Sequence, residues 1–178
     1  TSGRRHFDHD GNRFAERTGW VGAKDGLLVR DLNGNGQIDS GLELFGSHTL
    51  LPSGRLASHG FEALAALDQD GDGILNAADP SWSSLRIWVD ANSSACVDPD
   101  ELRSLSSLGI ESLSLRFSTL HSLDPQGNVH RQIGTYRHHD GSQRAMHDVW
   151  FAVDPARSLD LHDKIENPLL NRRPNIPG

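Results

Sequence analysis

Apolar residues in this chain come in short stretches, separated by segments rich in Asp, Asn and Gly. The segment 61–67 combines good helix formers with apolar residues at helical spacing, which predicts a short helix. Residues 26–30 favour a strand, and residues 110–117 alternate apolar with polar positions, as a half-buried strand does. Two more apolar segments flank the Asp140-Gly141 turn, which predicts a β-hairpin there. Together with the strand at 110–117, this gives a predicted β-hairpin region over 110–153.

The polar segments predict four loops, at 8–19, 31–43, 68–79 and 90–101. In each loop, positions 1, 3 and 5 are Asp, Asn or Ser. The four loops hold 14 of the 24 acidic residues and two of the 17 basic ones. The net charge of −7 is therefore the balance of strongly acidic loops and a mildly basic remainder. An overall acidic chain argues against nucleic acid as a partner. No apolar run is long enough to span a membrane, and the N-terminus lacks the apolar core of a signal peptide.

Alternating oxygens suit Ca²⁺, a hard cation that takes about six to eight oxygen ligands, from positions 1, 3, 5, 7, 9 and 12 of an EF-hand-type loop. The loop 68–79 fits best, with Asp at positions 1, 3 and 5 and glycine at position 6, where the chain turns sharply. We expect Leu75, at position 8, to form a short strand that pairs with another loop. The predicted ligands are Asp68, Asp70, Asp72, the Ile74 carbonyl, Asn76 and Asp79.

The loop 31–43 has one extra residue before its closing acid, so Glu43 falls at position 13. Its predicted ligands are Asp31, Asn33, Asn35, the Gln37 carbonyl, Asp39 and Glu43. The loop 90–101 has Ala95 in place of the turn glycine, and its Asp98-Pro99 pair also resembles the cap of a helix over 101–107 that Gly109 would stop. Its predicted ligands are Asp90, Asn92, Ser94, the Cys96 carbonyl, Asp98 and Glu101.

The loop 8–19 is the weakest match, because Arg13 replaces the turn glycine and Gly19 stands where the closing acid belongs. Two interpretations of this loop remain: a turn that binds no metal, and a Ca²⁺ site whose coordination is completed by water. We therefore expect two or three Ca²⁺ ions in the chain. With one cysteine the chain cannot form an internal disulfide, so bound metal would brace the loops in its place.

Ten histidines raise the question of transition-metal chemistry. His138, His139, Asp140 and His147 lie across the predicted hairpin, so a zinc or nickel site is one interpretation, although no His-Glu-x-x-His motif is present. Cys96 has no His and Asp framework around it in the sequence, so nucleophilic catalysis is not expected. We predict no catalytic residues and no organic cofactor, and we expect the four tryptophans to fill the core.

Several segments together resemble a calcium-binding module of large bacterial RTX or hemolysin-type secreted proteins. They are Phe7-Asp-His-Asp-Gly-Asn, Arg17-Thr-Gly-Trp-Val-Gly, Asp25-Gly-Leu-Leu-Val-Arg-Asp-Leu-Asn-Gly-Asn-Gly, Glu43-Leu-Phe-Gly, Gly60-Phe-Glu-Ala-Leu-Ala-Ala-Leu-Asp, Leu85-Arg-Ile-Trp-Val-Asp and Glu101-Leu-Arg-Ser-Leu. The resemblance implies that calcium folds the module. In self-processing members it also implies calcium-promoted cleavage of an Asp-Pro bond at the N-terminal edge, after which the freed aspartyl group is linked to a lysine. The family's Asp-Pro strand is not in this sequence, and none of the pairs Asp79-Pro80, Asp98-Pro99, Asp124-Pro125 and Asp154-Pro155 matches the processed position.

We therefore expect an α+β fold of EF-hand-like calcium loops with short helices and a small antiparallel β-sheet or hairpin. One module would span 1–166, followed by an extended or disordered tail at 167–178. Its expected function is to fold on Ca²⁺ binding outside the cell, as part of a larger secreted bacterial protein. Its partners would be other domains of that protein and a host or bacterial surface partner that the sequence does not identify. Two alternatives stay open: a self-processing module, and a dockerin-like calcium-dependent interaction module.

Overall fold

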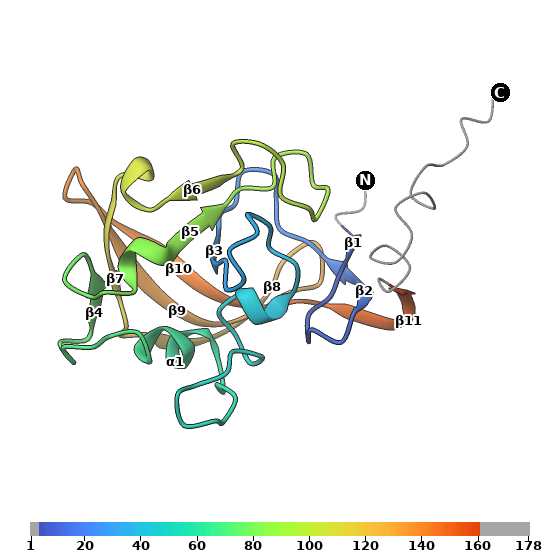
Figure 1. Ribbon diagram of the computed structural model, residues 1–178, viewed down its shortest axis with the longest axis horizontal. Helices are drawn as coiled ribbons and strands as arrows, with labels where there is room; N and C mark the ends of the chain where they lie inside the picture. Colours follow the sequence, from blue (N-terminus) through green and yellow to red (C-terminus); the bar gives the residue numbers. More distant parts are fainter. Residues whose placement is uncertain (1–3, 161–178) are drawn as a thin grey trace.

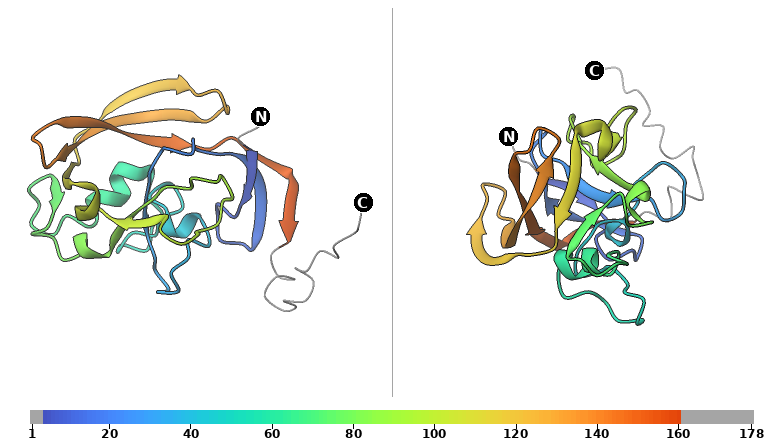
Figure 2. Two further views of the ribbon diagram at one scale, coloured as in Figure 1. Left: turned by 90° about the horizontal axis from the view of Figure 1, so that it is seen from above. Right: turned by 90° about the vertical axis from the view of Figure 1, so that its left-hand side faces the viewer.

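The computed structural model describes residues 4–160, and the tail predicted at 167–178 lies outside them. The described strands form three antiparallel sheets (Figures 1 and 2). The N-terminal sheet contains β1 (Arg4–Phe7), β2 (Phe14–Gly19) and β11 (Val153–Asp160). The small sheet contains β3 (Leu27–Arg30), β5 (Leu85–Trp88) and β6 (Leu102–Ser104). The central sheet contains β4 (Ile74–Asn76), β7 (Ile110–Ser114), β8 (Ser118–Leu123), β9 (Val129–His138) and β10 (Gln143–Trp150).

The predicted α+β class is wrong, because the described residues form a β-rich domain with a single α-helix of six residues, α1 (Gly60–Ala65). The remaining helical segments are 3₁₀ turns at Gly41–Glu43, Trp82–Ser84 and Ser106–Leu108. A segment of a few residues gains too few internal hydrogen bonds to form a helix alone. Its conformation is therefore decided by the strands that it can pair with.

In the segment 101–107, pairing with a neighbouring strand replaces the predicted helix. The first residues of this segment form β6, in which Leu102 pairs with Trp88 of β5. Gly109, with φ of 73°, ends the 3₁₀ turn that follows, at the stop that the sequence indicates. Four local predictions are confirmed wholly or in part: α1 lies within the segment 61–67 apart from its first residue, β3 forms, β7 covers 110–114 of the strand predicted at 110–117, and β9 and β10 make the hairpin.

The core has two main parts, one on each face of the small sheet: Val29 and Trp88 face the first, and Leu85 faces the second. The first contains two tryptophans in edge-to-face contact, with ring centres 5.5 Å apart, and the second is aliphatic around a third tryptophan. The first consists of Phe7, Trp20, Val29, Ile38, Trp88 and Ala95, and the second of Leu64, Leu75, Trp82, Leu85, Leu105 and Leu113. Trp20, Trp82 and Trp88 are buried as expected, whereas Trp150 is half-buried under the guanidinium of Arg131, 4.2 Å away.

The four Asp-rich loops connect these strands on the side opposite the long β8, β9 and β10 strands (Figure 2). Within residues 4–160, no helix has the length and apolar character needed to cross a membrane.

Candidate metal centre

All four loops begin with an aspartate whose carboxylate accepts hydrogen bonds from backbone N–H groups further along the same loop. In the loop 68–79, Asp68 accepts from Gly71 and from Gly73, both at 2.9 Å. The same pattern links Asp31 to Gly34 and Gly36, Asp90 to Ser94 and Ala95, and Asp8 to Gly11 and Arg13. The chain therefore wraps around the first carboxylate, as cation-binding loops of this type require.

The closing acid of three loops fixes the other end. Asp79 is buried, and its two oxygens accept the N–H groups of Gln69 and Asn76, each at 3.0 Å. These N–H groups come from positions 2 and 9, so the closing acid clamps the start of the loop to its end. Two other closing acids make the same clamp. The Glu43 carboxylate accepts from the N–H groups of Leu32 and Asp39, and the Glu101 carboxylate accepts from those of Ala91 and Asp98.

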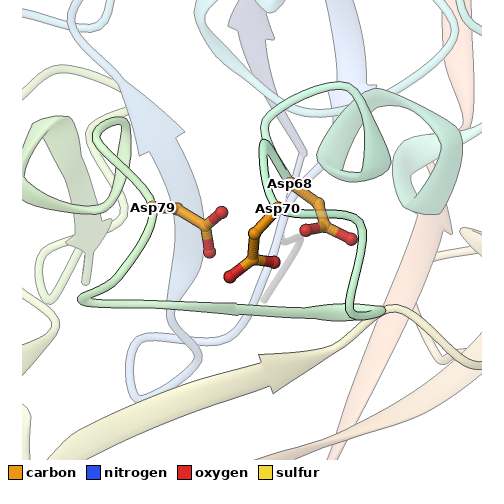
Figure 3. Close-up of side chains that lie close together, drawn as sticks. All are labelled: Asp68, Asp70 and Asp79. Carbon is orange, nitrogen blue, oxygen red and sulfur yellow. The ribbon is translucent and has the colours of Figure 1, made fainter.

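Three carboxylates of the loop 68–79 meet in one place (Figure 3). Asp68, Asp70 and Asp79 each offer an oxygen atom within 4.8 Å of the other two, so the group could hold a metal ion. The other predicted side-chain ligands lie outside this group: Asp72 accepts from the Ile74 N–H at 2.8 Å, and Asn76 accepts from Ala78.

The electrostatics of this group fit a cation. The Asp72 N–H lowers the pKa of Asp70, but desolvation, the charges of Asp72 and Asp79 and the bond with Asp68 outweigh it, so the pKa is raised. The pKa of Asp68 is lowered, chiefly by the N–H of Gly73. A divalent cation would relieve the repulsion that Asp70 experiences.

In the loop 31–43 the side chains at positions 3, 5 and 9 converge. Asp39 accepts from the amide nitrogens of Asn33 and Asn35, at 3.1 and 2.8 Å. Rotation of these amides by a half-turn presents their oxygens instead, so the same positions suit a cation. The predicted ligand at Gln37 is its backbone carbonyl, and its side-chain amide is used otherwise, since it donates to the carbonyl of Val97 at 3.3 Å.

In the loop 90–101 the corresponding groups also meet. Asp98 accepts from the Asn92 amide at 2.7 Å and lies 3.3 Å from the Ser94 hydroxyl, which donates to the Cys96 carbonyl at 2.9 Å. Position 6 does not need glycine here, because Ala95 itself adopts a left-handed φ of 57°. This conformation is strained for a residue with a Cβ atom.

Two tryptophans hold the end carboxylates of this loop, a feature that no local pattern indicates. The indole N–H of Trp20 donates to Asp90 at 2.6 Å, and both residues are fully buried. The indole N–H of Trp88 lies 3.5 Å from Glu101, which is also buried. The first part of the core therefore positions the loop 90–101.

The loop 8–19 has only part of this arrangement. Glu16, at position 9, takes the place of the closing acid and accepts from the His9 N–H at a long 3.4 Å. Arg13 occupies the turn position with φ of 70°. Among the described residues, this loop therefore lacks the closing clamp that Asp79, Glu43 and Glu101 provide in the other three.

The expected pairing of loops through Leu75 is wrong. Leu75 lies in β4 opposite Leu113 of β7, so this loop is attached to the central sheet. The loop 31–43 instead contacts two others: the Gln37 amide donates to the Val97 carbonyl of the loop 90–101, and the Gly41 N–H donates to the Asp8 carbonyl of the loop 8–19 at 2.7 Å.

Fold and site together define a β-rich domain with Asp and Asn loops, one of which gathers three carboxylates suited to a metal ion. The chain belongs to the SPM domain family, which it matches over residues 1–152. It is similar to the iron-regulated protein FrpA of Neisseria meningitidis serogroup C, with 47% identity over 160 residues. This alignment covers 90% of the chain and 14% of the relative, so the chain corresponds to a small part of that protein.

Proposed function

We propose that the chain is a calcium-binding module of a larger secreted bacterial protein of the RTX type, and that Ca²⁺ binding drives its folding outside the cell. The observation that carries the proposal is the hydrogen-bond arrangement shared by the loops 31–43, 68–79 and 90–101. In each, an aspartate and a closing acid wrap the backbone while oxygen-bearing side chains between them face one another.

The donor set points to Ca²⁺ among common metals. The converging groups are carboxylates, amides, a hydroxyl and a backbone carbonyl, and the cluster of Asp68, Asp70 and Asp79 contains no histidine or thiol. Oxygen ligands of this kind suit hard cations, and loops of this length are used for Ca²⁺ rather than for the smaller Mg²⁺.

Coupling to folding follows from charge. Without a cation, Asp68, Asp70 and Asp79 hold like charges close together, which disfavours the folded state. A site at about 100-fold saturation adds about 2.7 kcal/mol to the stability of the native state. Two such sites supply an amount comparable to the whole stability of a small domain, about 5–15 kcal/mol. At millimolar Ca²⁺ outside the cell, this saturation requires a Kd of about 10 µM, which EF-hand-type loops reach.

The test counts ions after the first ligand of each loop is changed. Calorimetric titration of the unchanged chain should give two or three Ca²⁺ ions. Asp31→Asn, Asp68→Asn and Asp90→Asn should each remove or weaken one of them. The control is Glu111→Gln, since Glu111 is an exposed acid outside the loops, 3.7 Å from Arg137. Unchanged stoichiometry in all three variants, or no binding by the unchanged chain, would contradict the proposal.

The self-processing alternative gains no support from the geometry of the described residues. Cleavage at Asp-Pro would need an aspartate carboxyl free to attack its own carbonyl group. The Asp79 carboxylate is clamped by two backbone N–H groups, the Asp98 carboxylate accepts from the Asn92 amide and the Ser94 hydroxyl, and the Asp124 carboxylate accepts three hydrogen bonds. We expect mass spectrometry to find this chain intact after incubation with Ca²⁺.

A further inference from the structure

Two histidine rings face one another on the central sheet, outside the four loops. Nδ1 of His130 in β9 lies 3.1 Å from Nδ1 of His147 in β10, with the ring planes at 85°. The cluster suggested by the sequence, His138 and His139 with Asp140 and His147, forms only in part: Nδ1 of His138 lies 3.3 Å from Asp140, but His147 is placed elsewhere. His138 packs on His139 with ring centres 4.3 Å apart, and His147 contacts His130 instead.

A β-bulge brings the two rings together. His147 pairs with Ile133, but after the bulge Val149 pairs with His130, so that Arg131 is left without a partner in the ladder. Side chains alternate between the faces of a strand, so one extra residue turns the following side chains to the other face. His130 therefore shares the face of His147 as its diagonal neighbour, while the Arg131 guanidinium lies over the Trp150 ring.

The separation of the two nitrogens fits a shared metal ion. Imidazole nitrogen binds Zn²⁺ at about 2.0–2.1 Å, so two nitrogens on one ion lie about 2.9–3.4 Å apart for angles between square and tetrahedral. The observed 3.1 Å falls inside this range. His147 is exposed and His130 half-buried, so an ion and its water ligands can reach both.

A carboxylate behind His130 orients the ring. Asp124 lies 3.5 Å from Nε2 of His130, the nitrogen that faces away from His147. Asp124 is fixed in the turn between β8 and β9, where it accepts from the N–H groups of Gln126 and Asn128 and from the Asn128 amide, all at 2.9 Å. A carboxylate on the far nitrogen favours the tautomer with a free Nδ1 lone pair and is the usual partner of a metal-bound histidine.

We propose that His130 and His147 bind one divalent transition-metal ion through their Nδ1 atoms, with Asp124 positioning His130. Imidazole suits Zn²⁺, Ni²⁺ and Cu²⁺, and water completes the coordination. Such a site is independent of the oxygen-rich loops, because hard Ca²⁺ does not compete for imidazole nitrogen.

The test is a calorimetric titration of the full chain with Zn²⁺ and Ni²⁺ in excess Ca²⁺, which keeps any calcium loops occupied. We expect one site per chain, with the affinity reduced about tenfold or more by His130→Ala or His147→Ala, and by about 10–100-fold in Asp124→Asn. His121→Ala is the matched control, since His121 is an exposed histidine of the adjacent strand β8, and it should bind as the unchanged chain does.

Nitrogen-15 spectra of the histidine rings test the same point without a substitution. Zn²⁺ should shift Nδ1 of His130 and His147 and leave the other rings unchanged. The proposal is overturned if the shifts fall on His138 and His139, if both alanine variants bind with unchanged affinity, or if no stoichiometric binding occurs.

Discussion

The hydrogen bond between Trp20 and Asp90 links the core to the loop 90–101 and can be removed with little change of shape. Trp20→Phe keeps an aromatic ring but deletes the indole N–H that donates to Asp90 at 2.6 Å. Both residues are fully buried, so water cannot replace the lost donor. A hydrogen bond to a charged group contributes about 1.5–3 kcal/mol, and we expect the free energy of unfolding to fall by that amount plus the loss from the smaller ring.

Trp82→Phe provides the control, because Trp82 is buried in the other part of the core and no described carboxylate accepts from its indole. Urea denaturation in saturating Ca²⁺, followed by far-ultraviolet circular dichroism, compares the two variants. With a urea dependence of about 2 kcal/mol/M, the midpoint of Trp20→Phe should lie about 1 M below that of Trp82→Phe.

A double-mutant cycle with Asp90→Asn assigns the effect to this pair. We expect a coupling energy of about 1 kcal/mol or more between the substitutions at Trp20 and Asp90. Equal midpoints for Trp20→Phe and Trp82→Phe, or no coupling in the cycle, would show that the Trp20–Asp90 hydrogen bond does not stabilise the fold.

Three further substitutions test separate features. Arg13→Gly should stabilise the fold by about 1 kcal/mol in urea denaturation, because Arg13 is exposed and holds a φ of 70° that glycine adopts without strain; a loss of stability would contradict this. Burial and the charge of His48 outweigh Asp10 and lower the pKa of His9 from 6.5 to about 4, so the unfolded chain protonates first as the pH falls. Stability should therefore decrease between pH 6.5 and 4, by about 2 kcal/mol at pH 5 relative to pH 8, and His9→Gln should reduce this dependence; identical pH profiles would exclude the mechanism. Asp70→Asn should lower the melting temperature in saturating Ca²⁺ but not in EDTA, because it removes both a ligand charge and a like-charge repulsion; a loss in both conditions would indicate a purely structural role.

The loops could be located from the sequence because their signal is local. Alternating oxygens at positions 1, 3 and 5 and glycines with positive φ are required by the turn itself, as Gly71 and Gly73 show with φ of 72° and 81°. The carboxylates that the structure gathers, Asp68, Asp70 and Asp79, are therefore all within the predicted set.

The elements between the loops could not be predicted in the same way, because their conformation depends on distant partners. Leu75 forms a strand, but its partner Leu113 comes from the central sheet, and Leu102 gives up a local helix to pair with Trp88. These choices are decided by non-local packing, which outweighs intrinsic propensity in such short segments.

Two side-chain contacts near the sites could not be predicted for the same reason. Trp20 and Asp90 are 70 residues apart, and no spacing in the chain connects them. The pairing of His130 with His147 depends on the bulge at Arg131, since without it the two rings would lie on opposite faces of the sheet.

The account as a whole depends on calcium as the force that folds the domain. The most direct measurement follows the far-ultraviolet circular dichroism of the metal-free chain as Ca²⁺ is added, with thermal melts at the two ends of the titration. We expect a cooperative gain of β-structure that is complete by millimolar Ca²⁺, and a large rise in melting temperature over the sample in EDTA. A chain that is equally folded and melts at the same temperature in EDTA and in Ca²⁺ would contradict it.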